Sequence, residues 1–171
     1  MAKSGTDKTL TVDANVVKYR FLFTNGHPLP QGLPVNRIRD FCNSVMDKYP
    51  IAINDFIRTE YEQPVGLEPI KNWLKERNKN DLAVEVERLP LPQDIKSSLG
   101  NDYGFDCQSR DAIYLGTCLN TIFKHLITEN TAHFMRPHHT RGRRPMRDFV
   151  QRRLCISIYT IDECCSSLLN D

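Results

Sequence analysis

Three acidic residues, Asp13, Glu60 and Asp111, stand at positions where a carboxylate could bind a basic partner or a cation. Asp13 follows a short β-prone run at 10–12 and precedes a segment patterned as a helix. Glu60 follows two apolar residues at spacings of three and four, and Asp111 precedes two apolar residues at spacings of four and seven. Both acids therefore lie beside the buried stripe of an expected helix. A buried carboxylate needs a basic partner or a cation. Because Mg²⁺ and Mn²⁺ prefer oxygen ligands, we expect one of these two solutions around the three acids.

Each acid also has a simpler explanation when it is taken alone. Asp13 would cap the helix that follows it, since aspartate is favoured at that position. Glu60 would pair with an arginine at the edge of a buried face. Asp111 would occupy a first helical turn, where the helix dipole attracts negative charge. These explanations are weaker when all three acids converge on one edge of the fold.

Segments typical of strands alternate with segments typical of helices along the chain. Strands are expected near 9–13, 50–53, 82–89, 124–128 and 154–160. Helices are expected up to about residue 23, across 38–49, after Asn54, over 67–78, around 92–99, after Ser109 and from 161 onward, with a loop over 100–107. This alternation predicts an α/β fold with a mainly parallel sheet.

The carboxyl ends of the expected strands carry polar residues. Asp13 ends the first strand, and Glu129 and Asn130 follow the strand near 124–128. Ligands of open parallel sheets gather beyond the carboxyl ends of the strands. We therefore expect these groups to share one edge of the sheet.

The composition excludes several classes of protein. The 171 residues are 40% hydrophobic and 26% charged, which is typical of one globular domain. No apolar run approaches the ~18 residues of a membrane span, so we expect no membrane partner. The six cysteines contain no CxxC pair, and we expect them to be reduced thiols in a cytoplasmic protein.

The segment from 134 to 153 is rich in arginine and holds a single acid, Asp148. Its arginines are Arg136, Arg141, Arg143, Arg144, Arg147, Arg152 and Arg153. Two prolines and a glycine predict an extended loop, which would be an RNA-binding arm or a solvated loop that covers the acidic edge. We expect His133, His138 and His139 to be loop histidines, because no Cys or Glu lies at zinc spacing from them.

Five stretches, in this order, resemble motifs of the PIN domain, the fold of many metal-dependent ribonucleases that include the VapC-type toxins. They are "TVDANVV", "YPIAINDFIRTEYEQ", "SRDAIYLGTCL", "HLITENTAHF" and "CISIYTIDECCSSL". The resemblance covers nearly the whole chain. It implies a single PIN-like domain over 1–171, built as a three-layer α/β/α sandwich with a mainly parallel central sheet. The arginine-rich segment would be an insertion at about 134–153.

The resemblance also implies a site for Mg²⁺ or Mn²⁺. Its catalytic, metal-binding acids would be Asp13, Glu60 and Asp111, with Glu129 and Asn130 as further ligands and with Asn15 and Thr128 as orienting groups or phosphate contacts. The family often has an aspartate where this chain has Asn130. Either Glu129 replaces that acid or a second ion is held weakly, so one-metal and two-metal chemistry both stay open.

The activity implied is hydrolysis of RNA phosphodiester bonds by a metal-activated water. The substrate would be single-stranded or structured RNA, and the role would be that of a toxin with an antitoxin partner, with homodimers also expected. In VapC-type systems a partner inserts a basic residue near the acids; here the arginine-rich segment would supply one. The alternatives are a non-catalytic PIN-like module that binds RNA or protein, which Asn130 favours, and a DNA-acting nuclease, because phosphate contacts carry no sequence information.

Overall fold

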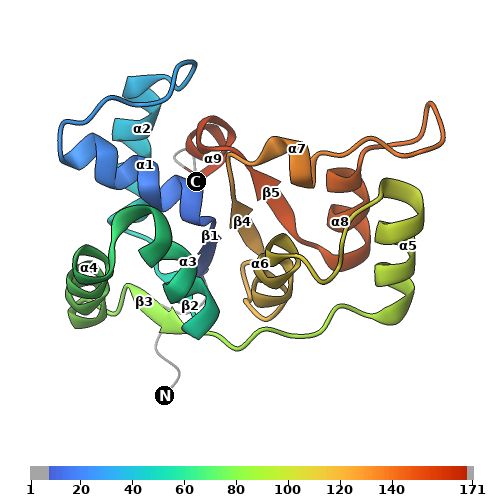
Figure 1. The fold of residues 1–171 in the computed structure, drawn as a ribbon, viewed down its shortest axis with the longest axis horizontal. Helices are drawn as coiled ribbons and strands as arrows, with labels where there is room; N and C mark the ends of the chain where they lie inside the picture. The colour runs from blue at the N-terminus through green and yellow to red at the C-terminus, as the bar shows by residue number, and fades with distance from the viewer. Residues whose placement is uncertain (1–7, 169–171) are drawn as a thin grey trace.

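The computed structural model describes residues 8–168; residues 1–7, expected to be a polar start, and 169–171 lie outside it. Its sheet has the order β3-β2-β1-β4-β5, and every neighbouring pair is parallel. The strands are β1 (Leu10–Val12), β2 (Ile51–Ile53), β3 (Ala83–Glu85), β4 (His125–Ile127) and β5 (Ser157–Tyr159). With helices on both faces, the fold is the expected three-layer α/β/α sandwich (Figure 1).

The helices alternate with these strands along the chain. They are α1 (Ala14–Thr24), α2 (Val35–Phe41), the π-helical turn η2 (Cys42–Met46), α3 (Asp55–Val65), α4 (Leu67–Lys79), α5 (Gln93–Tyr103), α6 (Arg110–Leu119), α7 (Thr131–Phe134), α8 (Met146–Leu154) and α9 (Ile161–Leu168). The helix expected across 38–49 is therefore present but ends in a π turn. The expected loop over 100–107 is wrong for its first four residues, because α5 continues to Tyr103, which is buried.

The central strands are buried throughout, as expected for a parallel sheet covered on both faces. Every residue of β1 and β2 is buried. On one side, Tyr61 of α3 donates its hydroxyl to the carbonyl of Val12 at 2.7 Å. Its ring is fully buried, so this contact fixes α3 against the carboxyl end of β1.

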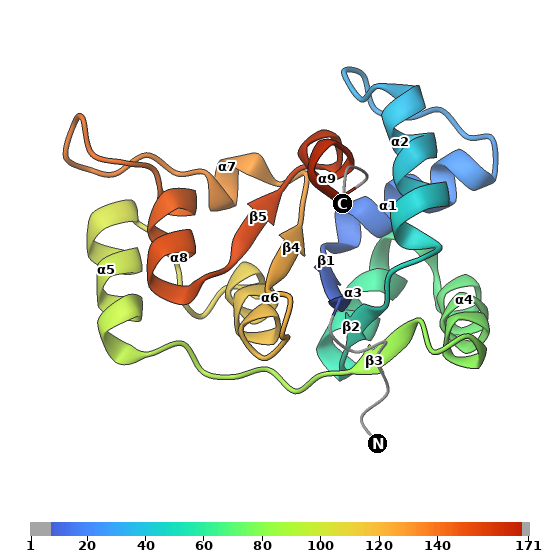
Figure 2. The same ribbon diagram turned by 180° about the vertical axis from the view of Figure 1, so that it is seen from behind.

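The helices form two groups on either side of the central strands. In Figure 1, α1, α2 and α4 lie to the left of β1, and α5 and α8 lie to the right. The last helix, α9, returns to the first group and lies beside α2 (Figure 2). There Arg37 pairs with Asp162 at 2.8 Å, and the thiol of Cys165 donates to the carbonyl of Arg37 at 3.5 Å.

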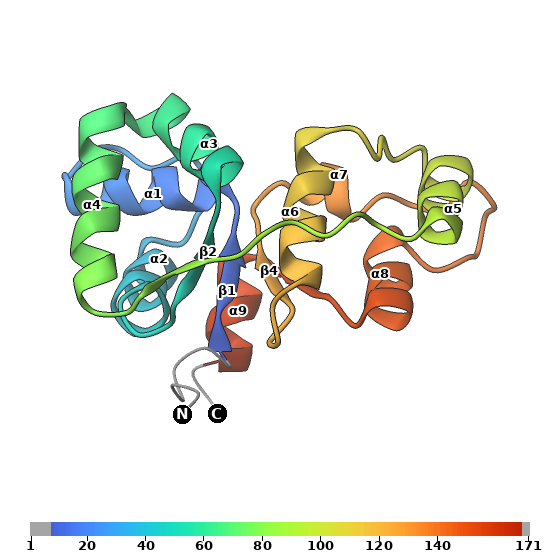
Figure 3. The same cartoon turned by 90° about the horizontal axis from the view of Figure 1, so that it is seen from below.

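A linker over 86–92 crosses between the two groups, passing along α6 (Figure 3). The expected strand over 82–89 is thus too long, because only its first part pairs in the sheet. The amide of Leu89 donates to the carbonyl of Gly116 at 2.9 Å, and Asn120 donates to the carbonyl of Glu87 at 2.8 Å. A Cβ at Gly116 would lie 2.5 Å from the carbonyl oxygen of Leu89, so only glycine permits this close approach.

The arginine-rich segment differs from its prediction. Residues 135–145 form no regular structure, but Met146–Leu154 is the helix α8. Its buried residues Met146, Val150 and Leu154 recur at helical spacing and belong to the hydrophobic core. The prediction of an extended loop is therefore wrong for this half, because an apolar helical face lies among the arginines.

The cysteines carry no disulfide in the described part of the chain, where all six are free thiols. Burial raises the pKa of the Cys165 thiol to about 11, which keeps it protonated near neutral pH. Among residues 8–168, no helix combines the length and the apolar character that crossing a membrane requires.

Candidate acidic site

Asp13 lies at the junction of β1 and α1, and its carboxylate has two structural partners. One oxygen accepts the amide of Asn15 at 3.2 Å, which caps α1. The other accepts the hydroxyl of Thr128 at 2.6 Å, and Thr128 is fully buried just after β4. Asp13 is 5% exposed. The helix-cap explanation is therefore correct, but it uses only one of the two carboxylate oxygens.

Glu60 and Asp111 approach the same region from α3 and α6, and each has a basic neighbour. Arg110 lies 3.4 Å from a carboxylate oxygen of Glu60, whose side chain is 12% exposed. The Nδ1 atom of His133 lies 2.5 Å from an oxygen of Asp111, whose side chain is 18% exposed. Both basic side chains are more exposed than the acids with which they pair.

The three acids line one open cavity of about 740 Å³. Its other lining residues are Ala14, Asn15, Gln63, Pro64, Ser109, Arg110, Tyr114, Asn130 and His133. The hydroxyl of Tyr114 accepts the amide of Ala14 at 3.2 Å, which joins α6 to the start of α1. The cavity thus gathers side chains from α1, α3, α6 and the turn after β4 at the carboxyl edge of the sheet, as expected.

The pKa values of Asp13 and Glu60 are raised, chiefly by burial and in part by neighbouring acids. Burial raises the pKa of Asp13, the hydrogen bonds from Thr128 and Asn15 lower it, and the charge of Asp111 raises it further. Burial also raises the pKa of Glu60; Arg110 lowers it, and the charges of Asp13 and Asp111 raise it. In both cases the net pKa is above its ordinary value. A cation in the cavity would relieve this unfavourable accumulation of negative charge.

The donor atoms suit Mg²⁺ or Mn²⁺, since they are carboxylate oxygens with the amide carbonyl of Asn130 beside them. As the side chains stand, however, no three His, Cys, Asp or Glu residues between 8 and 168 are arranged to hold one ion. Glu60 is directed to Arg110 and Asp111 to His133. Metal binding therefore requires these two acids to exchange their basic neighbours for the ion.

Glu129 is not part of this cavity. One of its carboxylate oxygens accepts the amide of Ile161 at 2.6 Å, at the start of α9. Asn130, the next residue, does line the cavity, and its amide group lies 2.8 Å from Nδ1 of His133. In this arrangement Glu129 does not supply the acid that the family often has at Asn130.

Two residues in the cavity were missed by the sequence analysis. Arg110 directly precedes Asp111, and His133 was expected to be a loop histidine. His133 instead lies in α7, three residues after Asn130, where one helical turn brings the two side chains together. The spacing of three residues could therefore have predicted that His133 lies beside Asn130.

The arginine-rich segment does not reach the cavity, and none of its seven arginines lines it. Arg147 pairs with Glu163 at 2.8 Å, Arg153 pairs with Asp94 at 2.7 Å, and Arg136 donates to a backbone carbonyl of Gly104 at 2.6 Å. The guanidinium of Arg152 donates to the carbonyl of Asp148 at 3.3 Å. The exposed arginines of the loop are Arg141, Arg143 and Arg144.

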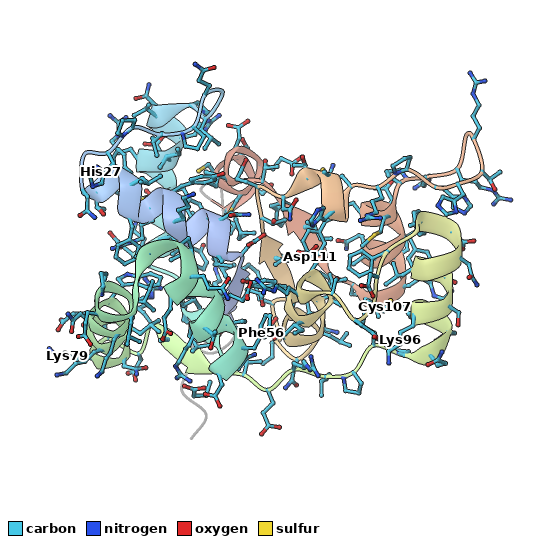
Figure 4. The ribbon with its side chains drawn as sticks, viewed as in Figure 1. His27, Phe56, Lys79, Lys96, Cys107 and Asp111 are labelled. Carbon is cyan, nitrogen blue, oxygen red and sulfur yellow. The ribbon has the colours of Figure 1, made fainter. Side chains whose placement is uncertain are left out.

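This loop extends past α5 and α8, at the far end of the molecule from α1, whereas Asp111 lies near the middle (Figure 4). The expectation that this segment places an arginine beside the acids is therefore wrong. Arg110 of α6 occupies that position instead.

Comparisons of this chain with protein-family models, with curated proteins and with solved structures found no match in any of the three.

Proposed function

We propose that this protein is a PIN-like, divalent-metal-dependent ribonuclease that hydrolyses phosphodiester bonds at the acidic cavity. The observation that carries the proposal is the convergence of Asp13, Glu60 and Asp111, from three separate elements, on one cavity at the carboxyl edge of a parallel sheet. The proposal is supported by the raised pKa values of Asp13 and Glu60, to which burial contributes most and neighbouring acids contribute in part.

In this proposal the three acids hold Mg²⁺ or Mn²⁺, and Asn130 adds a neutral oxygen ligand. When bound, the metal supplies positive charge for the attacking and leaving oxygens of the phosphodiester. Thr128 fixes one oxygen of Asp13, so the carboxylate is oriented before a ligand arrives. With an ion bound to Glu60 and Asp111, Arg110 and His133 would no longer pair with these acids, and the forked guanidinium of Arg110 would be available to a phosphate.

The arginine-rich segment contributes to RNA binding through its loop. Arg141, Arg143 and Arg144 are exposed and suit phosphate contacts away from the cavity. Three other arginines stabilise the fold through contacts within the protein: Arg136, Arg147 and Arg153. Their expected contribution to nucleic-acid binding is therefore smaller than that of the loop arginines. The cytoplasmic location is supported by the free thiols. The toxin role, an antitoxin partner and a homodimer are supported by the sequence resemblance alone.

The direct test is cleavage of a labelled single-stranded RNA with Mn²⁺, followed on a gel. Wild type is expected to cut, and EDTA or Asp13→Asn is expected to abolish cutting. Asp55→Asn is a matched control, because Asp55 begins α3 with an exposed side chain and does not line the cavity. An intact RNA with every divalent metal, or undiminished cutting by Asp13→Asn, would contradict the proposal.

A second candidate is a non-catalytic module that binds RNA or protein. It is favoured by Asn130 and by the basic partners that already balance Glu60 and Asp111. This candidate predicts RNA binding without cleavage and no stabilisation by Mn²⁺. A labelled single-stranded DNA of the same sequence, run beside the RNA, tests the DNA-acting alternative.

A further inference from the structure

We propose that a second recess, beside the acidic cavity, holds one unstacked nucleotide of a single-stranded RNA next to the bond that is cut. The recess encloses about 520 Å³ between α6 and the 86–92 linker. Ser109, the residue before α6, lines both the recess and the acidic cavity. The two spaces are therefore neighbours across one residue. This inference rests on the proposed function.

The lining of the recess suits a nucleotide. Leu89 and Ile113 supply apolar surface for the face of a base, and the amide of Gln108 can pair with a base edge. Arg88 and Lys96 add two positive charges for phosphate, and no acidic residue among residues 8–168 lines the recess. The charge thus changes sign between the two spaces, as a metal site and a neighbouring phosphate-binding site require.

Ser109 adds a further polar group at this shared wall. Its side-chain oxygen is buried and has no hydrogen-bond partner among residues 8–168, although it occupies the cap position of α6. Buried hydroxyl groups are usually satisfied, so an unpaired one between two open spaces indicates a missing partner. This oxygen is not exposed to either space as the side chain stands, so a phosphate or ribose oxygen would become its partner once the Ser109 side chain turns towards the recess.

The recess is also held open by fixed backbone. The Leu89–Gly116 hydrogen bond and the lack of a Cβ at Gly116 hold the linker against α6. On the opposite side, the thiol of Cys107 contacts the carbonyl of Lys96 at 3.7 Å. Figure 4 shows Lys96 and Cys107 close together, with Asp111 further towards the middle of the molecule. The recess is therefore a formed space with apolar and basic walls.

A base in such a recess must leave its stack, which favours a single strand over a duplex. The first test measures binding of a short fluorescent single-stranded RNA in EDTA, by anisotropy. Changing both Arg88→Glu and Lys96→Glu is expected to raise Kd about tenfold or more. The control changes Lys71→Glu and Lys75→Glu on the exposed face of α4, which alters the net charge equally. Equal weakening by both pairs would overturn the proposal.

The second test uses the wild-type protein and needs no variant. Cys107 lines the recess, whereas Cys155 is exposed elsewhere, at the end of α8. Single-stranded RNA is expected to slow alkylation of Cys107, and not of Cys155, when the labelled peptides are quantified by mass spectrometry. Unchanged labelling of Cys107 at saturating RNA, or equal protection by a duplex of the same sequence, would overturn the proposal.

A cleavage assay with Mn²⁺ on the same samples separates the two proposals. Cutting without protection of Cys107 would retain the ribonuclease function and reject the nucleotide site. Protection and charge-specific binding without cutting would retain the nucleotide site and reject the ribonuclease function.

Discussion

The acidic cavity gathers residues that are far apart in the sequence, whereas the arginine-rich segment disperses residues that are adjacent. The cavity is lined by three acids from separate elements, Asp13, Glu60 and Asp111. Among the arginines, Arg147 and Arg153 pair with acids on different helices, and the loop arginines face solvent. The geometry of a parallel sheet explains the first case, since all strand ends meet at one edge. No comparable constraint keeps neighbouring arginines on one surface.

The largest expected effect distinguishes the two halves of the arginine-rich segment. Met146 of α8 is fully buried, so Met146→Ala is expected to lower the free energy of unfolding by about 2–5 kcal/mol. Arg144→Ala, in the exposed loop, is expected to change it by less than about 0.5 kcal/mol. Urea unfolding followed by circular dichroism measures both. Equal effects would show that α8 is not packed as described.

The next effect concerns the cavity and metal. At 100 times its Kd, Mn²⁺ is expected to stabilise the wild type by about 2.7 kcal/mol, because it binds only the folded state. Asp13→Asn is expected to lose this stabilisation. A variant with alanine at Arg141, Arg143 and Arg144 is expected to keep it. Thermal unfolding with and without Mn²⁺ provides the measurement, and an unaltered response of Asp13→Asn would exclude Asp13 as a ligand.

A smaller effect is expected for the arginine loop. Replacing Arg141, Arg143 and Arg144 by alanine should weaken RNA binding about tenfold, or about 1.4 kcal/mol. It should also reduce the slope of log affinity against log salt by about 2, since each phosphate contact on a single strand contributes about 0.7. The exposed residues Lys71 and Lys75 provide the alanine control. An unchanged slope would remove the loop from the RNA-binding surface.

The smallest effect is a pH dependence at Asp13. Burial raises its folded-state pKa above 3.8, so the folded state holds the proton more tightly than the unfolded state. This contribution to stability is complete at low pH and is lost as pH rises through the folded-state pKa. Without metal, the stability of Asp13→Asn relative to wild type should therefore increase over this range. Urea unfolding in EDTA at several pH values tests this; a constant difference would contradict it.

The sequence predicted those parts of the site that lie just after the carboxyl ends of strands. The positions of Asp13 and Asn130 could be anticipated, because polar residues after parallel strands share an edge. Glu129 could not be assigned, since adjacent residues at a strand end point to opposite sides, and its carboxylate meets α9 instead. The α8 helix was missed because its apolar spacing lies among arginines. The contact between His133 and Asp111 depends on α7, a helix of a single turn.

The hydrogen bond between Thr128 and Asp13 also bears on the order in which the cavity is assembled. Its two residues are 115 positions apart, and the bond between Ala14 and Tyr114 spans 100 positions. Such long-range contacts form late, because loops must close before they are made. A chain still being synthesised has Asp13, Asn15 and Glu60 early, but the second carboxylate oxygen of Asp13 has no partner until β4 and Thr128 have been added. The cavity is therefore completed only after its last lining residue, His133, has been synthesised, and a shorter growing chain carries no finished site.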